Sequence, residues 1–388
     1  MKDVKIIIGA NYGDEGKGMV TRYFANNTDN PIIILHNGTA QRGHTVDYNL
    51  NMRHVYHHFG SGTAEGIPTF YASSFYIHPM EFHREREELI NKNINVPIAF
   101  YDPCALIITP FDMLVDRATE AYIQWEHGER EYGSCAMGTW CATDRWPVNL
   151  FTAEEWFNSI LHREHTYEEL YKYMMQVSFN ECYRILCSRR VDLDKIPEYK
   201  KYFDKTNGYY ENISFNFFCD LSFMNSYCRE KSFNQIYDSY DSLIFENGQG
   251  LGLDKDVDDE WHTTSHTGLT NPLEMLQDKN DFNAEVCYVT RSYLTRHGIG
   301  NLEQEVNKNE INKDMCDLTN IHNEFQGSLR YGYLDDKTQQ LRITKDWDAV
   351  KNDNRFKKSM AITHCNEFKD SYINADYVSY NPYSILKR

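Results

Sequence analysis

A glycine-rich segment near the amino terminus has the residue types that bind phosphate. Residues 13–18 read GDEGKG, between a β-branched run and a stretch that suits a helix. Backbone N–H groups at a helix start attract anions, and Lys17 adds a positive charge. Asp14 would repel a phosphate unless it binds a cation or takes a proton, which predicts a chemical role; an ordinary turn is the alternative. The loop is not a Walker A motif, because Asn11 and Gly18 replace its first glycine and its magnesium-binding Ser or Thr.

A second glycine-containing loop, at residues 37–45, follows another buried-strand candidate and contains His44. The neighbouring Gly43 lets the backbone come close to a ligand. A lone loop histidine is more often a solvated surface group, and that is the alternative here. With Asp14 as base and His44 as acid, the two loops would supply a workable catalytic pair around one phosphoryl group.

Further segments resemble the adenylosuccinate synthetase family, in the same order along the chain. The first loop is similar to the family's signature turn, and residues 42–45, RGHT, are similar to its Ala-Gly-His-Thr. The likeness continues at residues 133–138, 245–250, 253–254, 263–265, 295–300, 330–335 and 379–382. Residues 151–240 contribute little to it.

The resemblance implies a ligase of purine nucleotides. The 6-oxygen of a purine (deoxy)nucleoside monophosphate, IMP or dIMP, attacks the γ-phosphate of a nucleoside triphosphate, and the amine of L-aspartate then displaces the 6-phosphoryl group to give adenylosuccinate. The alternative substrate, (d)GMP, would give N6-succino-2-amino-(deoxy)adenylate for diaminopurine synthesis. In enzymes that use it, the resemblance implies a smaller residue in place of Asp14. A catalytically inactive nucleotide-binding protein is the alternative of another class.

The same resemblance implies roles for individual residues. Asp14 takes the purine N1 proton and binds Mg²⁺ together with the Gly43 carbonyl, His44 acts as an acid near the phosphoryl group, Lys17 stabilises its charge, and Gln249 positions the purine 6-oxygen. The implied nucleotide-binding residues are Gly13, Glu15, Gly16, Gly18, Gln41, Gly43, Thr45, Ser134, Cys135, Arg145, Thr263, Arg330, His364, Asn366, Ser379 and Asn381.

Two segments depart from the family pattern, as in its compact viral and archaeal branch. The aspartate-binding loop is shorter and keeps one arginine, so Gln326, Gly327, Ser328 and Arg330 are the candidates for holding L-aspartate. In the base-reading segment, Asn366 replaces an aspartate. An amide offers one acceptor and one donor, which suits adenine better than guanine. We therefore expect ATP or dATP, with GTP as the alternative phosphate donor.

The resemblance also implies a homodimer in which one arginine reaches the partner's nucleotide. Arg145 lies near the matching place; a surface ion pair is its alternative role. The formal charge of −17 argues against broad affinity for nucleic acid. The sequence contains no run of about 18 apolar residues, which a membrane span would require. The ten cysteines include no CxxC pair, which favours free thiols over disulfides or zinc. We expect a cytoplasmic protein, in the host cytoplasm if it is viral.

Apolar runs that alternate with helical stretches predict an α/β fold. Strands are expected at 4–8, 31–35, 105–109, 242–246, 285–291 and 360–363, and a helix at 19–24. Polar glycine loops after such strands are typical of the ligand edge of an open α/β sheet. We expect one large domain over residues 1–388, with a mostly parallel central sheet flanked by helices. Residues 151–240, with few glycines and apolar residues at helical spacing, predict a helical insertion within it.

Overall fold

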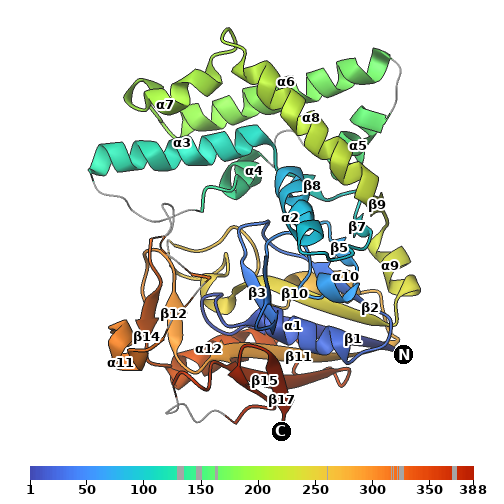
Figure 1. The fold of residues 1–388 in the computed structure, drawn as a ribbon, viewed down its shortest axis with the longest axis vertical. Helices are drawn as coiled ribbons and strands as arrows, with labels where there is room; N and C mark the ends of the chain where they lie inside the picture. The colour runs from blue at the N-terminus through green and yellow to red at the C-terminus, as the bar shows by residue number, and fades with distance from the viewer. Residues whose placement is uncertain are drawn as a thin grey trace.

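The computed structural model describes residues 1–128, 135–145, 151–161, 165–259, 261–315, 317, 319–320, 322, 327–368 and 374–388 (Figure 1). Within this part of the chain, one sheet of ten strands runs in the order β17-β16-β15-β11-β1-β10-β2-β5-β7-β9. The neighbouring strands are parallel except for β17, which is antiparallel to β16. The expected α/β fold with a mostly parallel central sheet is confirmed.

The central strands are β1 Lys2–Gly9, β2 Pro31–Leu35, β5 Thr69–Tyr71, β7 Ala99–Tyr101, β9 Cys228–Glu230, β10 Ser242–Gly250, β11 Phe282–Arg291, β15 Phe356–Thr363, β16 Tyr377–Asn381 and β17 Ser384–Lys387. The smaller sheets consist of β3 His44–Asn49 with β4 Met52–Tyr56, β6 Tyr76–Ile77 with β8 Leu106–Ile107, and β12 Leu294–Arg296 with β13 Glu305–Val306 and β14 Arg330–Gly332. The strand expected at 105–109 is thus the short β8, outside the central sheet.

Helices cover both faces of the sheet and form a separate layer at one end of the molecule (Figure 1). The helices around the sheet are α1 Lys17–Asn26, α2 Pro79–Asn91, α9 Phe233–Ser239, α10 Thr270–Leu276, α11 Lys308–Asn312 and α12 Asp336–Trp347. The layer consists of α3 Pro110–His127, α4 Thr139–Arg145, α5 Ala153–Leu161, α6 His165–Ser188, α7 Pro197–Lys200 and α8 Tyr209–Tyr227. The helices expected at 151–240 therefore share a layer with α3 and α4, and the same stretch returns β9 to the edge of the central sheet.

The long helix α3 begins and ends where its sequence dictates. Thr109 and Asp112 form a reciprocal capping box, and Pro110 occupies the first turn, where its missing N–H costs nothing. Gly128 ends the helix in the left-handed conformation, φ 70°.

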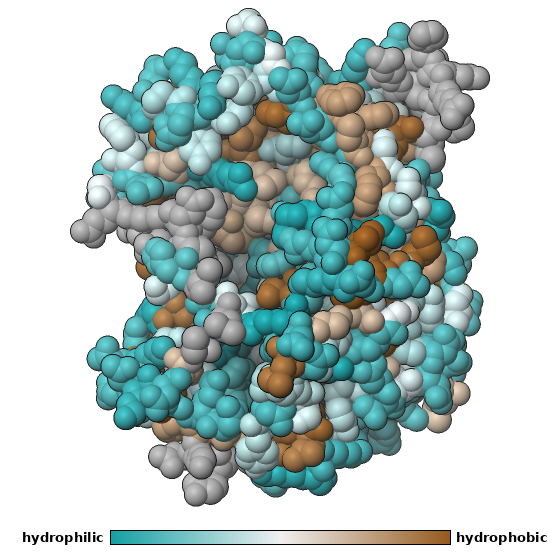
Figure 2. Space-filling view, viewed as in Figure 1, coloured by the Kyte–Doolittle hydropathy of each residue, from teal (hydrophilic) through white to brown (hydrophobic). Residues whose placement is uncertain are grey.

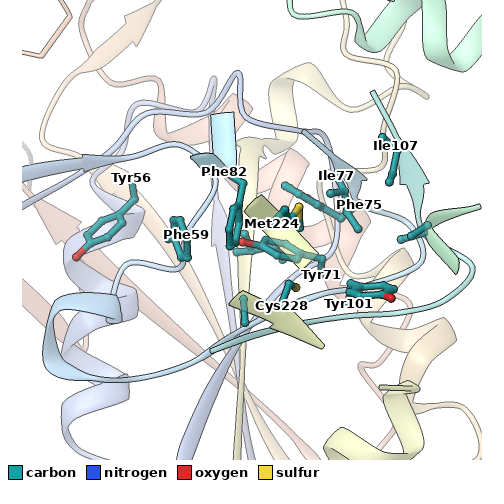
Figure 3. Packing of buried hydrophobic residues seen from close by; sticks show 14 of the residues in the cluster. Tyr56, Phe59, Tyr71, Phe75, Ile77, Phe82, Tyr101, Ile107, Met224 and Cys228 are labelled. Atoms are coloured by element: carbon teal, nitrogen blue, oxygen red, sulfur yellow. The ribbon is translucent and has the colours of Figure 1, made fainter. Parts of the chain in front are cut away.

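Two apolar clusters lie on the two faces of the sheet. In β2, Ile33 and Leu35 belong to one cluster, while Ile32 and Ile34 belong to the other. Because both faces are covered, the strand sequence is continuously apolar rather than alternating. Aromatic rings fill the first cluster, including Phe59 and Phe82 with ring centroids 4.8 Å apart (Figure 3).

The visible surface is mostly hydrophilic, with hydrophobic side chains gathered in separate patches (Figure 2). None of the described helices combines the length and apolar character that a membrane crossing requires. Every cysteine that the structure describes is a free thiol, as expected; Cys316 lies outside the described residues.

Three buried histidines, His36, His58 and His78, lie within or beside the core. The backbone N–H of His78 donates to Nε2 of His58 at 2.9 Å, which requires His58 to be neutral at that nitrogen. Burial lowers the pKa of His36 to about 3 and that of His78 to about 4, and it holds the pKa of His58 well below 6.5. All three are therefore neutral in the native protein at neutral pH.

These histidines predict an early loss of stability in mild acid. Below pH 6.5 the unfolded chain protonates them and the native protein does not, so the free energy of unfolding should fall as the pH decreases, by about 1–2 kcal/mol for each histidine between about pH 7 and pH 5. His36→Phe should flatten this dependence, and the exposed His127→Phe should not. Urea unfolding at several pH values measures both. Equal slopes for His36→Phe and the wild type would contradict the assignment.

Candidate active site

The first loop is held in shape by its own charged side chains. Gly13 and Gly16 adopt positive φ angles, 114° and 84°, which side chains disfavour. The Glu15 carboxylate accepts the N–H groups of Asn11 and Gly13, both at 2.9 Å. Lys17 Nζ donates to the Gly13 carbonyl at 2.6 Å and lies 3.3 Å from Glu15. Glu15 therefore holds the loop internally, while Lys17 and the first turn of α1 provide the positive charge.

Gly18 is required by close packing between the two loops. A Cβ at this position would lie 3.0 Å from the Cβ of His44 and 3.1 Å from both Ser61 Oγ and the Thr45 carbonyl. The Ser or Thr of a Walker A motif would not fit there without a shift of these neighbours. The departure from that motif thus brings α1 against β3, where His44 begins the strand.

His44 is bonded to a buried carboxylate that sequence analysis did not assign. Its Nδ1 lies 2.6 Å from Oε1 of Glu246, which is fully buried in β10. Glu246 also accepts hydrogen bonds from the N–H, at 3.1 Å, and the hydroxyl of Ser61, and its Oε2 lies 3.7 Å from Arg42 Nη1. Since a carboxylate only accepts, Nδ1 of His44 is the donor. Nε2 has no hydrogen-bond partner among the described residues.

The charges of this cluster balance one another. Burial lowers the pKa of His44 to about 4, although Glu246 opposes the shift. Burial alone would raise the pKa of Glu246, but Arg42, His44 and Ser61 together lower it to about 2. Glu246 is therefore ionised and His44 neutral in the unliganded protein at neutral pH. The sequence signal for Glu246 was a carboxylate directly after the apolar residues 243–245 of the strand.

Two cavities meet at the predicted catalytic residues. The larger has a volume of about 580 Å³ and the smaller about 150 Å³, and both are lined by Gly13, Asp14, Gly43 and His44. Of the other predicted residues, those that line the larger cavity are Gly16, Lys17, Thr45, His364, Asn366, Ser379 and Asn381. Those that line the smaller cavity are Gln41, Cys135, Gln249 and Thr263. The fold thus separates the predicted residues into two groups around one shared boundary.

Asp14 fits the ligand chemistry of Mg²⁺ at that boundary. Its backbone carbonyl accepts from Arg291, while no described residue hydrogen-bonds to its carboxylate. Nε2 of His297 lies 3.9 Å from Oδ2 of this carboxylate. A half-buried carboxylate beside the exposed backbone of Gly43 offers oxygen ligands of the kind that this ion prefers.

His297 was not predicted as a site residue. Its neighbours determine which ring nitrogen donates a hydrogen bond. The Asn320 amide N–H donates to Asp317 at 2.8 Å, so the Asn320 carbonyl oxygen faces Nε2 of His297, at 3.1 Å. Nε2 therefore donates this hydrogen bond. Nδ1 is buried and has no partner in the described part of the chain. His297 lines the smaller cavity, beside Asp14.

The predicted base-reading residues lie on the wall of the larger cavity. His364 has a positive φ of 59°, and its Nδ1 is hydrogen-bonded with the Thr363 hydroxyl at 2.7 Å. Asn366 is exposed, and no described residue hydrogen-bonds to its side chain. Asn381 instead uses its side-chain oxygen to accept the N–H groups of 383 and 384, both at 2.9 Å, in the β16–β17 turn. Ser379 donates its hydroxyl to the Asn381 carbonyl at 2.5 Å.

The predicted aspartate-binding residues lie apart from both cavities. Ser328 and Arg330 line a third one, of about 420 Å³. The Arg330 guanidinium pairs with Glu305 and donates to the carbonyls of 298 and 300, at 3.0 and 2.8 Å. Gly327 adopts a positive φ of 67° before β14. Arg330 does not line either nucleotide-sized cavity, contrary to its place in the predicted nucleotide-binding set; Gln326 and Ser134 lie outside the described residues.

Arg145 is placed neither at these cavities nor on the surface. It is 2% exposed in the helical layer, and its Nε and Nη2 donate to the two carboxylate oxygens of Asp112, both at 3.0 Å. Nη2 also donates to the Ile107 carbonyl at 3.2 Å. A buried, bidentate ion pair holds this guanidinium, so the alternative role as a surface ion pair is wrong, and the contact with a partner's nucleotide stays a prediction.

Comparison with known proteins identifies the family. The Adenylosuccinate synthetase family profile matches residues 6–344, so the chain belongs to the adenylosuccinate synthetase family. Adenylosuccinate synthetase of Dehalococcoides mccartyi (strain CBDB1) is 33% identical over 136 residues, 35% of this chain and 30% of that protein. The Mesoplasma florum protein of the same name is 22% identical over 307 residues, 78% of this chain and 64% of its own length. The matches therefore span less than two thirds of these relatives.

Solved structures share the fold. Fully ligated adenylosuccinate synthetase from Plasmodium falciparum gives a TM-score of 0.64 at 20% identity, covering 94% of this chain and 77% of that one. The cyanophage S-2L succinoaminodeoxyadenylate synthetase PurZ, bound to dGMP and to dATP as energy donor, gives 0.62 at 11% identity, covering 100% of this chain and 95% of that one. At identities this low, the TM-scores establish a common fold alone.

Proposed function

We propose that this protein is a carbon–nitrogen ligase that joins L-aspartate to the 6-position of a purine nucleoside monophosphate, with hydrolysis of a nucleoside triphosphate. The observation that carries the proposal is the boundary of Asp14, Gly43 and His44 shared by two cavities. A triphosphate in the larger cavity and a monophosphate in the smaller one would meet at these residues. Direct transfer of a phosphoryl group requires such an arrangement, because the reacting atoms must come within about 3–3.5 Å.

Each residue at the boundary has a role that follows from its contacts. The Asp14 carboxylate has no hydrogen bond to a described residue. It takes the purine N1 proton as the 6-oxygen becomes the nucleophile. His44 keeps its Nδ1–H on Glu246 and offers Nε2 to the phosphoryl group, donating when that nitrogen carries a proton. Lys17 and the start of α1 stabilise the developing charge. Asp14 and the Gly43 carbonyl would hold Mg²⁺, which supplies neutralisation of phosphate charge when bound.

IMP or dIMP is the first candidate substrate, because the chain keeps Asp14. A specific contact favours (d)GMP as the second candidate. Asp14 at purine N1 would place the group on C2 next to it, and His297 lies close by, with its Nε2 3.9 Å from Oδ2 of Asp14 and its Nδ1 without a hydrogen-bond partner among the described residues. A 2-amino group would donate to such an atom, while the C2–H of hypoxanthine would leave it unpaired. The product would then be the 2-amino analogue.

The remaining ligands are proposed on less direct support. Asn366 lines the larger cavity with an amide free to face a base, which supports ATP or dATP over GTP. L-Aspartate is placed near Ser328 and Arg330, at the third cavity. A homodimer in the cytoplasm, in which Arg145 contacts the partner's nucleotide, remains the expectation from family resemblance.

A matrix of substrates tests the function. The protein is incubated with Mg²⁺, L-aspartate, ATP or GTP, and each of IMP, dIMP, GMP and dGMP, and the succinylated nucleotide and phosphate are quantified. We expect product in at least one monophosphate column, with ATP. Turnover of GMP or dGMP but not IMP or dIMP would select the second candidate. No product in any well would leave a nucleotide-binding protein without catalysis.

Loss of either boundary side chain should slow turnover without unfolding the protein. We expect Asp14→Asn and His44→Asn each to lower kcat at least about 100-fold, because each replaces a proton-transfer group by an amide that does not titrate. Asp29→Asn, on an exposed loop, is the control for Asp14. Steady-state kinetics and urea unfolding measure activity and stability separately. A near-normal kcat in either variant would contradict the role of that residue.

The donor preference should depend on Asn366. A guanine donor facing the amide N–H₂ is a mismatch of about 1–3 kcal/mol, so ATP should exceed GTP in kcat/KM by about 10-fold or more. Asn366→Asp should shift this ratio toward GTP. Asn49→Asp, which adds the same charge to the wall of the same cavity, controls for charge alone. A kcat/KM for GTP above that for ATP, or an unchanged ratio in Asn366→Asp, would refute the assignment.

A further inference from the structure

Arg42 is a buried cation that joins three segments around His44. Its side chain is 1% exposed. Nε donates to the His57 carbonyl at 3.0 Å, Nη2 donates to the Phe59 carbonyl at 2.6 Å, and Nη1 lies 3.7 Å from Oε2 of Glu246. The second loop, the turn at 57–59 and strand β10 therefore meet at one guanidinium.

The turn at 57–59 is also held from its other side. The buried carboxylate of Glu85, in α2, accepts the N–H groups of His57, at 3.0 Å, of His58, and of Phe59, at 3.3 Å. Nδ1 of His57 donates back to the Arg42 carbonyl at 2.5 Å. Two opposite charges thus hold the N–H and C=O groups of one turn, which fixes the turn and the guanidinium relative to each other.

The turn leads directly to the other partner of Glu246. Ser61 lies two residues beyond Phe59, and its N–H and hydroxyl both donate to the Glu246 carboxylate. Arg42 therefore acts on Glu246 twice, by its own charge and by fixing the segment that carries Ser61. Glu246 in turn holds Nδ1 of His44 at 2.6 Å.

Charge balance makes the guanidinium necessary. A fully buried carboxylate without a counter-charge is strongly unfavourable and would draw in a proton or water, or move away. His44 supplies one hydrogen bond to Glu246 and Ser61 supplies two, while Arg42 is the permanently charged group among these partners. Without Arg42, Glu246 would lose its charged partner, and the imidazole would lose a fixed acceptor.

We propose that Arg42 is a positioning residue for phosphoryl transfer: its guanidinium fixes Glu246 and the turn at 57–59 as one unit, and through Glu246 it orients the imidazole of His44. Arg42 belongs to the wall of the smaller cavity, but its side chain is 1% exposed and its three nitrogens face the carbonyls of 57 and 59 and the Glu246 carboxylate, so it acts through these groups. The inference rests on the proposed function, because orientation of His44 is only measurable through a reaction that uses it.

A double-mutant cycle tests the proposal. Arg42→Met removes the charge at similar length, and Glu246→Gln removes the charge that Arg42 balances but keeps an acceptor for Nδ1–H. In the wild-type background we expect Arg42→Met to lower kcat about 10- to 100-fold with both KM values within about threefold. In the Glu246→Gln background the same change should lower kcat by less than about threefold, because the partner charge is absent.

Further variants separate positioning from stability. Arg42→Lys keeps the charge but cannot reach both carbonyls and Glu246, so it should lose about 3- to 10-fold in kcat; it also serves as the arm of the cycle if Arg42→Met does not fold. The matched control is Arg86→Met. Arg86 is a buried arginine of α2 whose guanidinium lies 3.4 Å from the Tyr227 ring centroid, so the change should reduce stability but not kcat of the folded enzyme.

The outcomes distinguish this inference from the proposed function. An inactive wild type overturns the function itself. An active wild type in which Arg42→Met or Arg42→Lys costs the same in both backgrounds, or changes only KM or stability, overturns the positioning role alone. A loss of kcat that depends on Glu246, with unchanged KM, supports it.

Discussion

The buried contact between Glu246 and His44 is the constraint on which the site depends. A carboxylate inside a parallel sheet is tolerated only with partners, and no neighbour in β10 supplies them. They come from the segments that carry His44, Ser61 and Arg42: His44 and Ser61 donate hydrogen bonds to the carboxylate, and Arg42 contributes a positive charge 3.7 Å away. The contacts that hold these loops on the sheet are therefore the same contacts that orient the imidazole. They also position the wall that the larger and the smaller cavity share.

The first loop follows the same logic with opposite signs. Its positive charge, Lys17, is buried and would be costly alone, and the loop contains the compensating carboxylate of Glu15. Because Glu15 also accepts two backbone N–H groups, the loop is organised before any phosphate arrives. An acidic residue in a phosphate loop thus contributes to preorganisation. Asp14, by contrast, has no described hydrogen-bond partner at its carboxylate and lines both cavities.

Proteins of low sequence similarity share this fold. Structures at 20% and 11% identity match nearly the whole chain. Three local contacts of this chain involve a buried arginine before Gly43, a histidine beside Asp14, and an arginine of the helical layer paired with Asp112. Because a common fold does not by itself define function, such contacts are where differences between proteins of this fold are to be sought.

The sequence by itself determined the elements whose signal is local. Apolar β-branched runs located β1, β2, β10, β11 and β15, and the glycine loops after them marked the ligand edge, because parallel strands end together. Collinear motifs identified the family. The tertiary structure alone decided which distant groups meet: His44 and Glu246 are 202 residues apart. It also showed Glu15 and Gly18 to be loop architecture, and Arg145 to be buried. Local pattern carries no information about such pairings, since they depend on how separate loops pack against one sheet.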